Sequence, residues 1–378
     1  MSPSEPLPRN KRRFIFVTMC VLFIILVPLF VLYAIGYRID VGNGETAFRA
    51  VGGIYINIGD SDLDLYKDEE RITDMRLFQR AAYIQSLSAG LHRVHVQGDG
   101  VHTWVKNLPV WPHLVTEARS FNMPIVPQIR VVGDYLDLET GAGVVFSDDI
   151  SPFAGFASTT NLWYATTSTS SITHVANNEH IYVAGLFATS TMNLYEQNRQ
   201  PRENFTFDRT PLEDLSSKAT TTQRIGRNTT LTFRSGEVYA SWTGPSRSLP
   251  FYYCLQYHGA SSTRAFYGDH VYEDLLRQGG DKANSFVLGE TVCRNEIRID
   301  RQNKKILWFD LFPDREDLVL MLLSDGLYVV EIDDRAWQNV QQIYLSDQMR
   351  VVVDGRQIYI KDGDWFVEIY TEIRTNRR

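Results

Sequence analysis

An uninterrupted apolar run at residues 14–35 constrains this chain more than any other feature of its sequence. The run is 22 residues long, contains no charged side chain, and follows the basic stretch at residues 9–13. As a helix rising about 1.5 Å per residue it would span roughly 33 Å, and the hydrocarbon core of a bilayer is about 30 Å thick. We therefore expect residues 14–35 to form a transmembrane helix in contact with the lipid bilayer.

The charges on either side of the run predict its orientation. Residues 1–13 carry four basic side chains against one acid, Glu5, whereas Arg38 and Asp40 cancel just after the run. The positive-inside rule then keeps the basic tail in the cytoplasm and exports everything that follows. A cleaved signal peptide is the alternative, with an apolar core of about 7 to 15 residues and a small-x-small cleavage site. The longer run favours a retained signal-anchor in the cell membrane.

The exported part has the composition of a β protein. Short runs of Val, Ile, Tyr, Phe and Thr are separated by Gly, Asp, Asn and Pro, a pattern typical of strands and tight turns. About 340 residues exceed one ordinary core, so we predict two domains, at residues 46–124 and 125–378. The net charge of −7 argues against a nucleic-acid partner, which requires a clustered basic face, and we expect none.

Three segments of the first domain carry a family resemblance. They are VGGIYI at residues 51–56, LSAGLHRVHV at residues 87–96, and GVHTWVK at residues 100–106. In the second segment the side chains alternate, and Val94 and Val96 mark the expected inward face. The three segments resemble the opening strand, the turn and strand, and the Trp-x-Lys segment of the PEGA domain, a small β-sandwich of exported prokaryotic proteins.

The order of the segments adds to this resemblance. A basic tail, one membrane helix, a small sandwich and a long β-rich region resemble the layout of PEGA-bearing envelope proteins of candidate-phylum bacteria. The resemblance implies a PEGA-like β-sandwich over residues 46–124 and an extracytoplasmic location. The chain departs from the family in lacking its four-residue signature, and Ala89 and His92 stand where Pro and Tyr are usual.

Asp-Gly pairs organise the second domain. Residues 305–333 are predicted to form a strand, a Pro-Asp turn, a strand, an Asp-Gly hairpin turn at residues 325–326 and a further strand. Two more Asp-Gly pairs stand at residues 354–355 and 362–363. This pattern resembles one blade of a β-propeller, and at about 40 to 45 residues per blade five or six blades fit. We predict a β-propeller-like domain at residues 125–378, with an irregular two-sheet sandwich as the alternative.

Two cysteines lie in the exported part, Cys254 and Cys293, while Cys20 lies within the apolar run. An even pair in an exported domain favours a disulfide, and two buried free cysteines are the alternative. The sequence has no Cys-x-x-Cys, so neither a zinc site nor a redox pair is supported.

An acidic stretch in the first domain has the alternation of a calcium loop, with Asp60, Asp62 and Asp64. An EF-hand requires glycine at its sixth position and glutamate at its twelfth, and this stretch has Leu65 and Arg71 there. A solvated acidic turn is therefore expected.

Four histidines form the other cluster with metal-ligating side chains: His92, His95, His102 and His113. Positions three apart along a strand face opposite ways, so His92 and His95 are poorly placed to share one ion. We predict surface histidines, and neither a metal site nor a cofactor.

Motifs for catalysis are missing from the sequence, which has no Gly-x-Ser-x-Gly elbow, no His-Glu-x-x-His and no phosphate-binding loop. Acids near turns at Asp310, Asp314, Asp317 and Glu331 would suit a glycosidase pair, but acidic turns are also ordinary in propellers. We predict no catalytic residues and a binding or scaffolding role, with an envelope protein or cell-wall glycan as partner. The alternatives are a propeller-type hydrolase of envelope glycans and a purely structural spacer.

Overall fold

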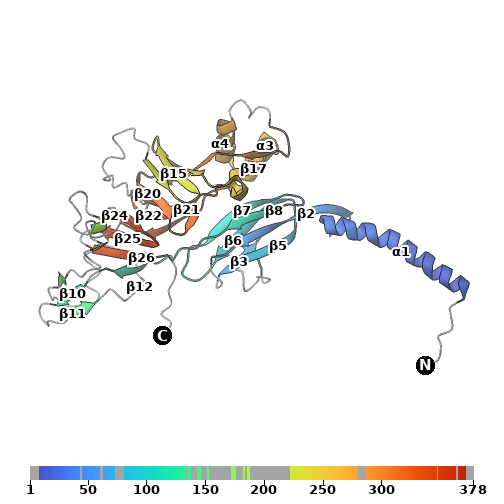
Figure 1. Cartoon of the computed structure of the whole chain (residues 1–378), viewed down its shortest axis with the longest axis horizontal. Helices are drawn as coiled ribbons and strands as arrows, with labels where there is room; N and C mark the ends of the chain where they lie inside the picture. The colour runs from blue at the N-terminus through green and yellow to red at the C-terminus, as the bar shows by residue number, and fades with distance from the viewer. Residues whose placement is uncertain are drawn as a thin grey trace, which may run out of the picture. The chain divides into compact units, whose positions relative to one another are not determined.

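The computed structural model shows a mainly β chain with one apolar helix near its N-terminus, as predicted. It describes residues 8–42, 45–59, 63–72, 81–132, 134–137, 143–145, 151–152, 172–175, 182–183, 185–187, 222–279, 286–346, 348–362 and 365–371. Most of these residues lie in strands, and three α-helices stand among them: α1 (Arg9–Ile35), α3 (Ala260–Tyr267) and α4 (Asp269–Gly279) (Figure 1).

The chain divides into two compact units. Unit 1 comprises residues 1–61, 67–94 and 107–120, and unit 2 comprises residues 62–66, 95–106 and 121–378. The segment at residues 95–106, which the sequence placed in the first domain, thus groups with the rest of unit 2.

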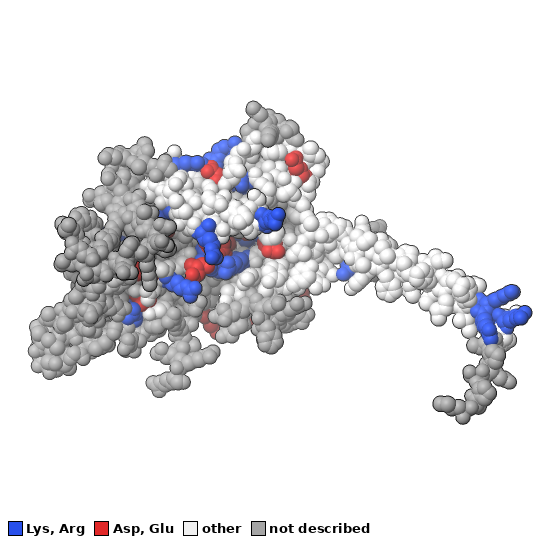
Figure 2. Space-filling view, viewed as in Figure 1, with Lys and Arg blue, Asp and Glu red and all other residues white. Residues whose placement is uncertain are grey.

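Helix α1 has 27 residues and none of its side chains is buried. It is long and apolar enough to cross a membrane. Its basic residues gather at its start, and uncharged side chains cover the rest of its visible face (Figure 2). The helix ends at Gly36, which adopts the left-handed conformation with φ +98° and donates its N–H to the carbonyl of Tyr33.

The main sheet of unit 1 is built on β2 (Glu45–Asn57). It pairs antiparallel with β1 (Tyr37–Gly42) and with β5 (Ala81–Ser88), and parallel with β8 (Val115–Arg119). Because β1 begins one residue after Gly36, α1 enters this sheet without a linker.

A second sheet has the strand order β4-β3-β6-β7. Its strands are β3 (Asp64–Lys67), β4 (Glu70–Arg71), β6 (Gly90–Gln97) and β7 (Trp104–Val110). Val94 and Val96 of β6 are fully buried, which confirms the expected inward face. On β7 the residues at alternate positions, Trp104, Lys106 and Leu108, are all fully buried, so a lysine stands in an otherwise apolar row.

The best-covered sheet of unit 2 is an antiparallel meander of four strands. These strands are β20 (Ile306–Phe312), β21 (Arg315–Leu323), β22 (Gly326–Glu331) and β23 (Val340–Tyr344). Every residue of β22 and the last six residues of β21 are buried. Both faces of these strands are therefore covered, which explains their nearly continuous apolar sequence.

A second large sheet of unit 2 joins segments far apart in sequence. In it β9 (Gln128–Val131) pairs antiparallel with β26 (Trp365–Tyr370), and β25 (Gln357–Asp362) and β24 (Met349–Asp354) follow. The strand β12 (Ser151–Pro152) pairs with β9 on its other edge.

Unit 2 contains two further sheets of three or more strands. One has the order β14-β15-β16-β19, and its strands are β14 (Thr222–Ile225), β15 (Thr229–Arg234), β16 (Glu237–Trp242) and β19 (Glu296–Arg298). The other has the order β11-β10-β13, with β10 (Asp134–Asp137), β11 (Gly143–Val145) and β13 (Ile172–Val175). None of the sheets closes on itself within the described residues, so the propeller stays a prediction.

Hairpins form at the Asp-Gly pairs of residues 325–326 and 354–355, as predicted, but in each hairpin the turn residues differ by one position from the Asp-Gly pair. Leu323 pairs with Gly326, so the turn residues are Ser324 and Asp325 and the glycine opens β22. In the β24–β25 hairpin the turn residues follow Asp354 and begin with Gly355, whose φ is +63°. The third predicted turn, at residues 362–363, lies partly outside the described residues.

The segment between β16 and β19 differs from the all-β prediction because it contains α3 and α4. Val271, Tyr272 and Leu275 are the buried residues of α4, and Thr263 and Tyr267 are those of α3. The segment also contains β17 (Cys254–Gln256) and β18 (Thr291–Cys293), which pair antiparallel. Cys254 and Cys293 stand opposite each other in this pair and form a disulfide, whereas Cys20 is free.

Candidate functional site

The densest group of charged side chains in the described residues surrounds the connection between β22 and β23. Pairing between β22 and β23 stops at Val330 and resumes at Val340, β22 ends at Glu331, and residues 332–339 form the loop between the two strands. The charged run EIDDR at residues 331–335 begins with the last residue of β22 and continues into the loop, and all five of these residues are buried. Burial of so many charges requires partners for each of them.

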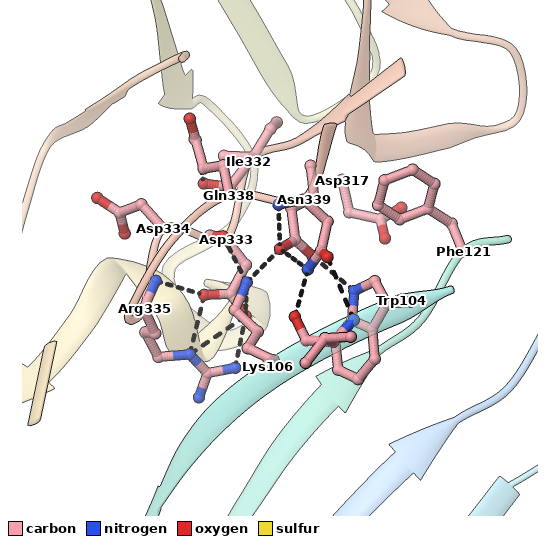
Figure 3. A network of polar contacts seen from close by, with 12 residues as sticks. Trp104, Lys106, Phe121, Asp317, Ile332, Asp333, Asp334, Arg335, Gln338 and Asn339 are labelled. Carbon is pink, nitrogen blue, oxygen red and sulfur yellow. Dashed lines mark hydrogen bonds and ion pairs between the residues drawn. The ribbon is translucent and has the colours of Figure 1, made fainter. Parts of the chain in front are cut away.

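The first partners come from β7. Trp104 and Lys106 stand two residues apart, so they share a face of the strand and extend toward the loop (Figure 3). The indole Nε1 of Trp104 donates to Oε2 of Glu331 at 3.0 Å, and Nζ of Lys106 donates to Oε1 of the same carboxylate. The ammonium group also donates to the backbone carbonyl of Asp333 at 2.6 Å.

Asn339, at the end of the loop, binds the same strand. Its Nδ2 donates to the carbonyl of Val105 at 2.9 Å, and its Oδ1 accepts the N–H of Val105 at 3.2 Å. The same Nδ2 lies 2.8 Å from Oε1 of Glu331. One amide side chain thus satisfies both backbone groups of the residue between Trp104 and Lys106.

Two further ion pairs extend the network. Arg335 donates to both carboxylate oxygens of Asp333, at 3.0 Å and 2.7 Å, and Lys106 lies 3.6 Å from the same carboxylate. Arg294 donates to both oxygens of Asp334 at 2.6 Å. The three acids and three bases carry no net charge together, and none of the six is more than 8% exposed.

The surroundings displace the pKa values of the two acids beside Lys106 in opposite directions. Burial raises the pKa of Glu331, and Asp333 raises it further against the opposing effect of Lys106. Burial also acts to raise the pKa of Asp333, but Arg335 and Lys106 outweigh it and lower the pKa to about 2. Asp333 is therefore the carboxylate that stays ionised at every ordinary pH.

The geometry of this network is that of a structural element, in which charged side chains hold two segments together. Both oxygens of each carboxylate accept hydrogen bonds from the chain, and the acids have almost no exposed surface through which a substrate would reach them. The network holds residues 104–106 against residues 331–339 within unit 2. We name these residues, together with Arg294, the ionic clamp.

The other acids weighed as a glycosidase pair each lie beside an arginine. Oδ2 of Asp317 is 2.5 Å from Arg315, Oδ2 of Asp314 is 2.7 Å from Arg356, and Oδ2 of Asp310 is 3.9 Å from Arg224. Burial raises the pKa of Asp310. With Glu331 in the ionic clamp, the four acids are held by four separate sets of partners.

The four histidines of the predicted cluster also have separate partners. His92 is bound between Oδ2 of Asp68, at 2.7 Å, and the carbonyl of Ser88, and the ring of His95 stacks on Tyr66 with centroids 4.6 Å apart. Nε2 of His102 lies 3.1 Å from the carbonyl of Gln342, and Nδ1 of His113 lies 2.6 Å from the carbonyl of Ile35. His92 is buried, contrary to the expectation of surface histidines.

No group of three or more potential metal ligands occurs in the part of the chain that the structure describes. Of the acidic stretch considered as a calcium loop, Asp60 and Asp62 lie outside the described residues, and Asp64 belongs to β3.

Sequence reasoning gave Trp104 a structural role and missed the partnership of Lys106. One signal was present: Lys106 occupies the same face of an alternating strand as Trp104 and Leu108. A lysine at an inward position predicts a buried acid as its partner. The identity of that acid was not accessible, because Glu331 is 225 residues away.

No protein-family model matches the chain, and no curated protein matches it.

Proposed function

We propose that this chain is a single-pass membrane protein with a cytoplasmic N-terminus and exported β-domains that bind or scaffold a partner in the cell envelope. The proposal rests mainly on the exposure of α1, because none of the side chains of its 27 residues is buried. A water-soluble chain would leave this apolar surface unburied, whereas a bilayer covers it. The partner class is an envelope protein or a cell-wall glycan.

The charges at the start of α1 support the orientation. The first turn has no acidic residue, and Arg9, Lys11, Arg12 and Arg13 stand at the positive end of the helix dipole. Cations at this end weaken an isolated helix, and anionic headgroups of the cytoplasmic leaflet would offset the effect. The Cys254–Cys293 disulfide supports the location of the β-domains, because such bonds persist in oxidising compartments.

Binding is favoured over hydrolysis by the state of the acids. The carboxylates considered for catalysis are held by Lys106, Arg315, Arg356 and Arg224, and Glu331 is almost fully buried. A buried clamp whose carboxylates are paired within the chain suits a protein that presents loops and strand edges to a partner.

The proposal includes the finer architecture expected from the sequence, a PEGA-like sandwich followed by a propeller. Two observations support the propeller: the four-stranded meander β20–β23, which is how one blade is built, and the pairing of β9 with β26. In a propeller, the ring of blades can be closed when a strand from the start of the domain joins the last sheet. β9 and β26 are paired in this way.

The membrane topology is tested with the full chain expressed in bacterial cells. We expect the protein to stay in the membrane fraction after alkaline carbonate extraction, and its β-domains to be digested by protease added to intact spheroplasts. A soluble polypeptide that begins after residue 36, or β-domains protected until the membrane is lysed, would contradict the proposal.

The binding role is tested with the full chain in lipid nanodiscs. We expect it to co-sediment with purified cell-wall glycan, or to retain a defined set of envelope proteins that empty nanodiscs do not retain. Release of sugar from labelled glycan would instead favour the hydrolase, and the variant Glu331→Gln would show whether the ionic clamp takes part.

A further inference from the structure

The end of α1 is fastened directly to the sheet of unit 1. The helix ends at Ile35, β1 begins at Tyr37, and the N–H of Val51 in β2 donates to the carbonyl of Gly36 at 2.9 Å. The helix terminus is therefore bound to β2, not only connected to β1.

Arg38 strengthens this junction from the other side. Its guanidinium carbon lies 3.7 Å from the centre of the Tyr33 ring, and its Nη1 donates to the carbonyl of Tyr33 at 2.8 Å. Its Nε donates to Oγ of Ser86 in β5 at 3.2 Å. A single side chain thus links the last turn of α1 to two strands of the sheet.

A tight turn between β7 and β8 lies at the same place. Leu114 N donates to the carbonyl of Trp111 at 3.2 Å, Pro112 takes the second position, and His113 has φ +63° in the third, as a type II turn requires. Nδ1 of His113 lies 2.6 Å from the carbonyl of Ile35, and its ring is 5.4 Å from that of Tyr37. The turn therefore touches the terminus of the apolar helix.

The turn also packs closely on β2, because Gly52 has no side chain. A Cβ at Gly52 would contact the carbonyl oxygens of Trp111 and Leu114, the second at 2.8 Å. The position of the turn beside α1 is thus fixed by its packing on β2 as well as by His113.

Exposed aliphatic side chains gather where β5 ends and β8 begins, opposite Val51 and Gly53 of β2. Leu114 and Val115, in and after the turn, are 44% and 43% exposed. Leu91, which is 41% exposed, follows the β5–β6 turn, and that turn starts at Ser88 opposite Val51. His113 places the first turn against Ile35, and Ser88, opposite Val51, places the start of the second turn one strand away.

We propose that this end of unit 1, made of the turn at residues 111–115 and Leu91, binds the surface of the lipid bilayer. The inference rests on the proposed function, in which α1 spans the membrane. Ile35 then lies at the edge of the hydrocarbon core, and the headgroup layer beyond it is about 5 to 7 Å deep. His113, in hydrogen-bonding distance of Ile35, lies within that layer, where aromatic rings and short apolar loops are stable.

The test uses the full chain in phosphatidylcholine and phosphatidylglycerol vesicles with a spin label at one cysteine. Cys20 is replaced by serine, the disulfide remains closed, and the label is attached to Leu114→Cys or, separately, to Leu91→Cys. The matched control is Gly59→Cys, where a Cβ meets no atom within 4 Å. β2 ends at Asn57, about 20 Å along the strand from Val51, and Gly59 follows two residues later.

We expect collisions with a water-soluble nickel chelate to be at least about threefold rarer at positions 114 and 91 than at position 59, as for interfacial side chains. Equal accessibility at all three positions would overturn the inference. A label on native Cys20 separates this failure from failure of the proposed function: it is shielded from the chelate if α1 spans the bilayer and accessible if it does not. Circular dichroism confirms that each labelled variant is folded.

Discussion

Replacement of Lys106 by methionine is the sharpest test of the ionic clamp. Methionine keeps most of the length of the side chain but removes the ammonium group that donates to Glu331 and to the carbonyl of Asp333. Glu331 keeps three donors, namely Trp104 Nε1 and the backbone and side-chain nitrogens of Asn339. Its charge, however, loses its only cation at bonding distance among the described residues.

The expected loss of stability follows from that arrangement. Removal of one partner of a buried ion pair costs about 3 to 5 kcal/mol, because the remaining charge is left buried and uncompensated. Since three hydrogen bonds to Glu331 remain, we expect a value near the lower limit, about 3 kcal/mol. The double variant Lys106→Met/Glu331→Gln removes both charges, so it should recover more than half of the loss.

The loss should also depend on pH in a predictable direction. Burial already raises the pKa of Glu331, and Lys106 opposes that effect, so the pKa rises further in Lys106→Met. Below the unfolded value of about 4.5 the group is protonated in both states and the variant differs least from the parent. At higher pH, the destabilisation should increase as the pH rises from the folded-state pKa of Glu331 in the parent to its higher folded-state pKa in the variant.

Urea unfolding of the full chain in detergent, followed by tryptophan fluorescence and by circular dichroism, measures these differences. The control is Lys305→Met, which removes an exposed lysine and should change stability by less than about 0.5 kcal/mol. A Lys106→Met protein as stable as the control, or a double variant less stable than the single one, would refute the reasoning.

Two further predictions concern the stability of the fold in acid and the contribution of the disulfide. Asp333, with a pKa of about 2 when folded against 3.8 unfolded, stabilises the fold above pH 3.8 and loses that contribution as the pH falls toward 2. The stability gap between the parent and Asp333→Asn should therefore shrink by about 1 kcal/mol from pH 5 to pH 3, as measured by urea midpoints; a constant gap would contradict the assignment. Opening the loop of 39 residues closed by Cys254 and Cys293 should cost about 4 kcal/mol in the chain-entropy model. Cys254→Ser tests this by thermal unfolding, and an unchanged midpoint against Cys20→Ser would show that the bond contributes nothing.

The features predicted correctly from the sequence are those set by near neighbours. The apolar run became α1, and the alternation in β6 placed Val94 and Val96 in the interior, because each pattern depends on residues a few positions apart. The turn at residues 325–326 shifted by one position because Gly326 can pair as a strand residue as readily as it can turn.

The helices α3 and α4 were missed for a physical reason. They have 8 and 11 residues, so each shows only two or three turns of periodicity, and helices that short are stabilised chiefly by packing. Val271 and Leu275 do stand four apart, and they are buried in α4. The pattern was present but too short to distinguish from the surrounding strands.

The ionic clamp was beyond sequence reasoning because its members are distant. Lys106 and Glu331 belong to strands 225 residues apart in sequence. In the sequence, only the inward position of the lysine indicated that it has a partner. Long-range pairs of this kind depend on the tertiary arrangement and leave no local periodicity.

The pairing of β9 with β26 sets the order in which this sheet can form during synthesis. Residues 128–131 emerge long before residues 367–370, their partners in the register. At about 5 to 20 residues per second, β9 waits roughly 10 to 50 s with this edge unpaired. An unpaired edge binds other strands readily, so the growing chain can mispair at this edge of β9 until its last strand arrives.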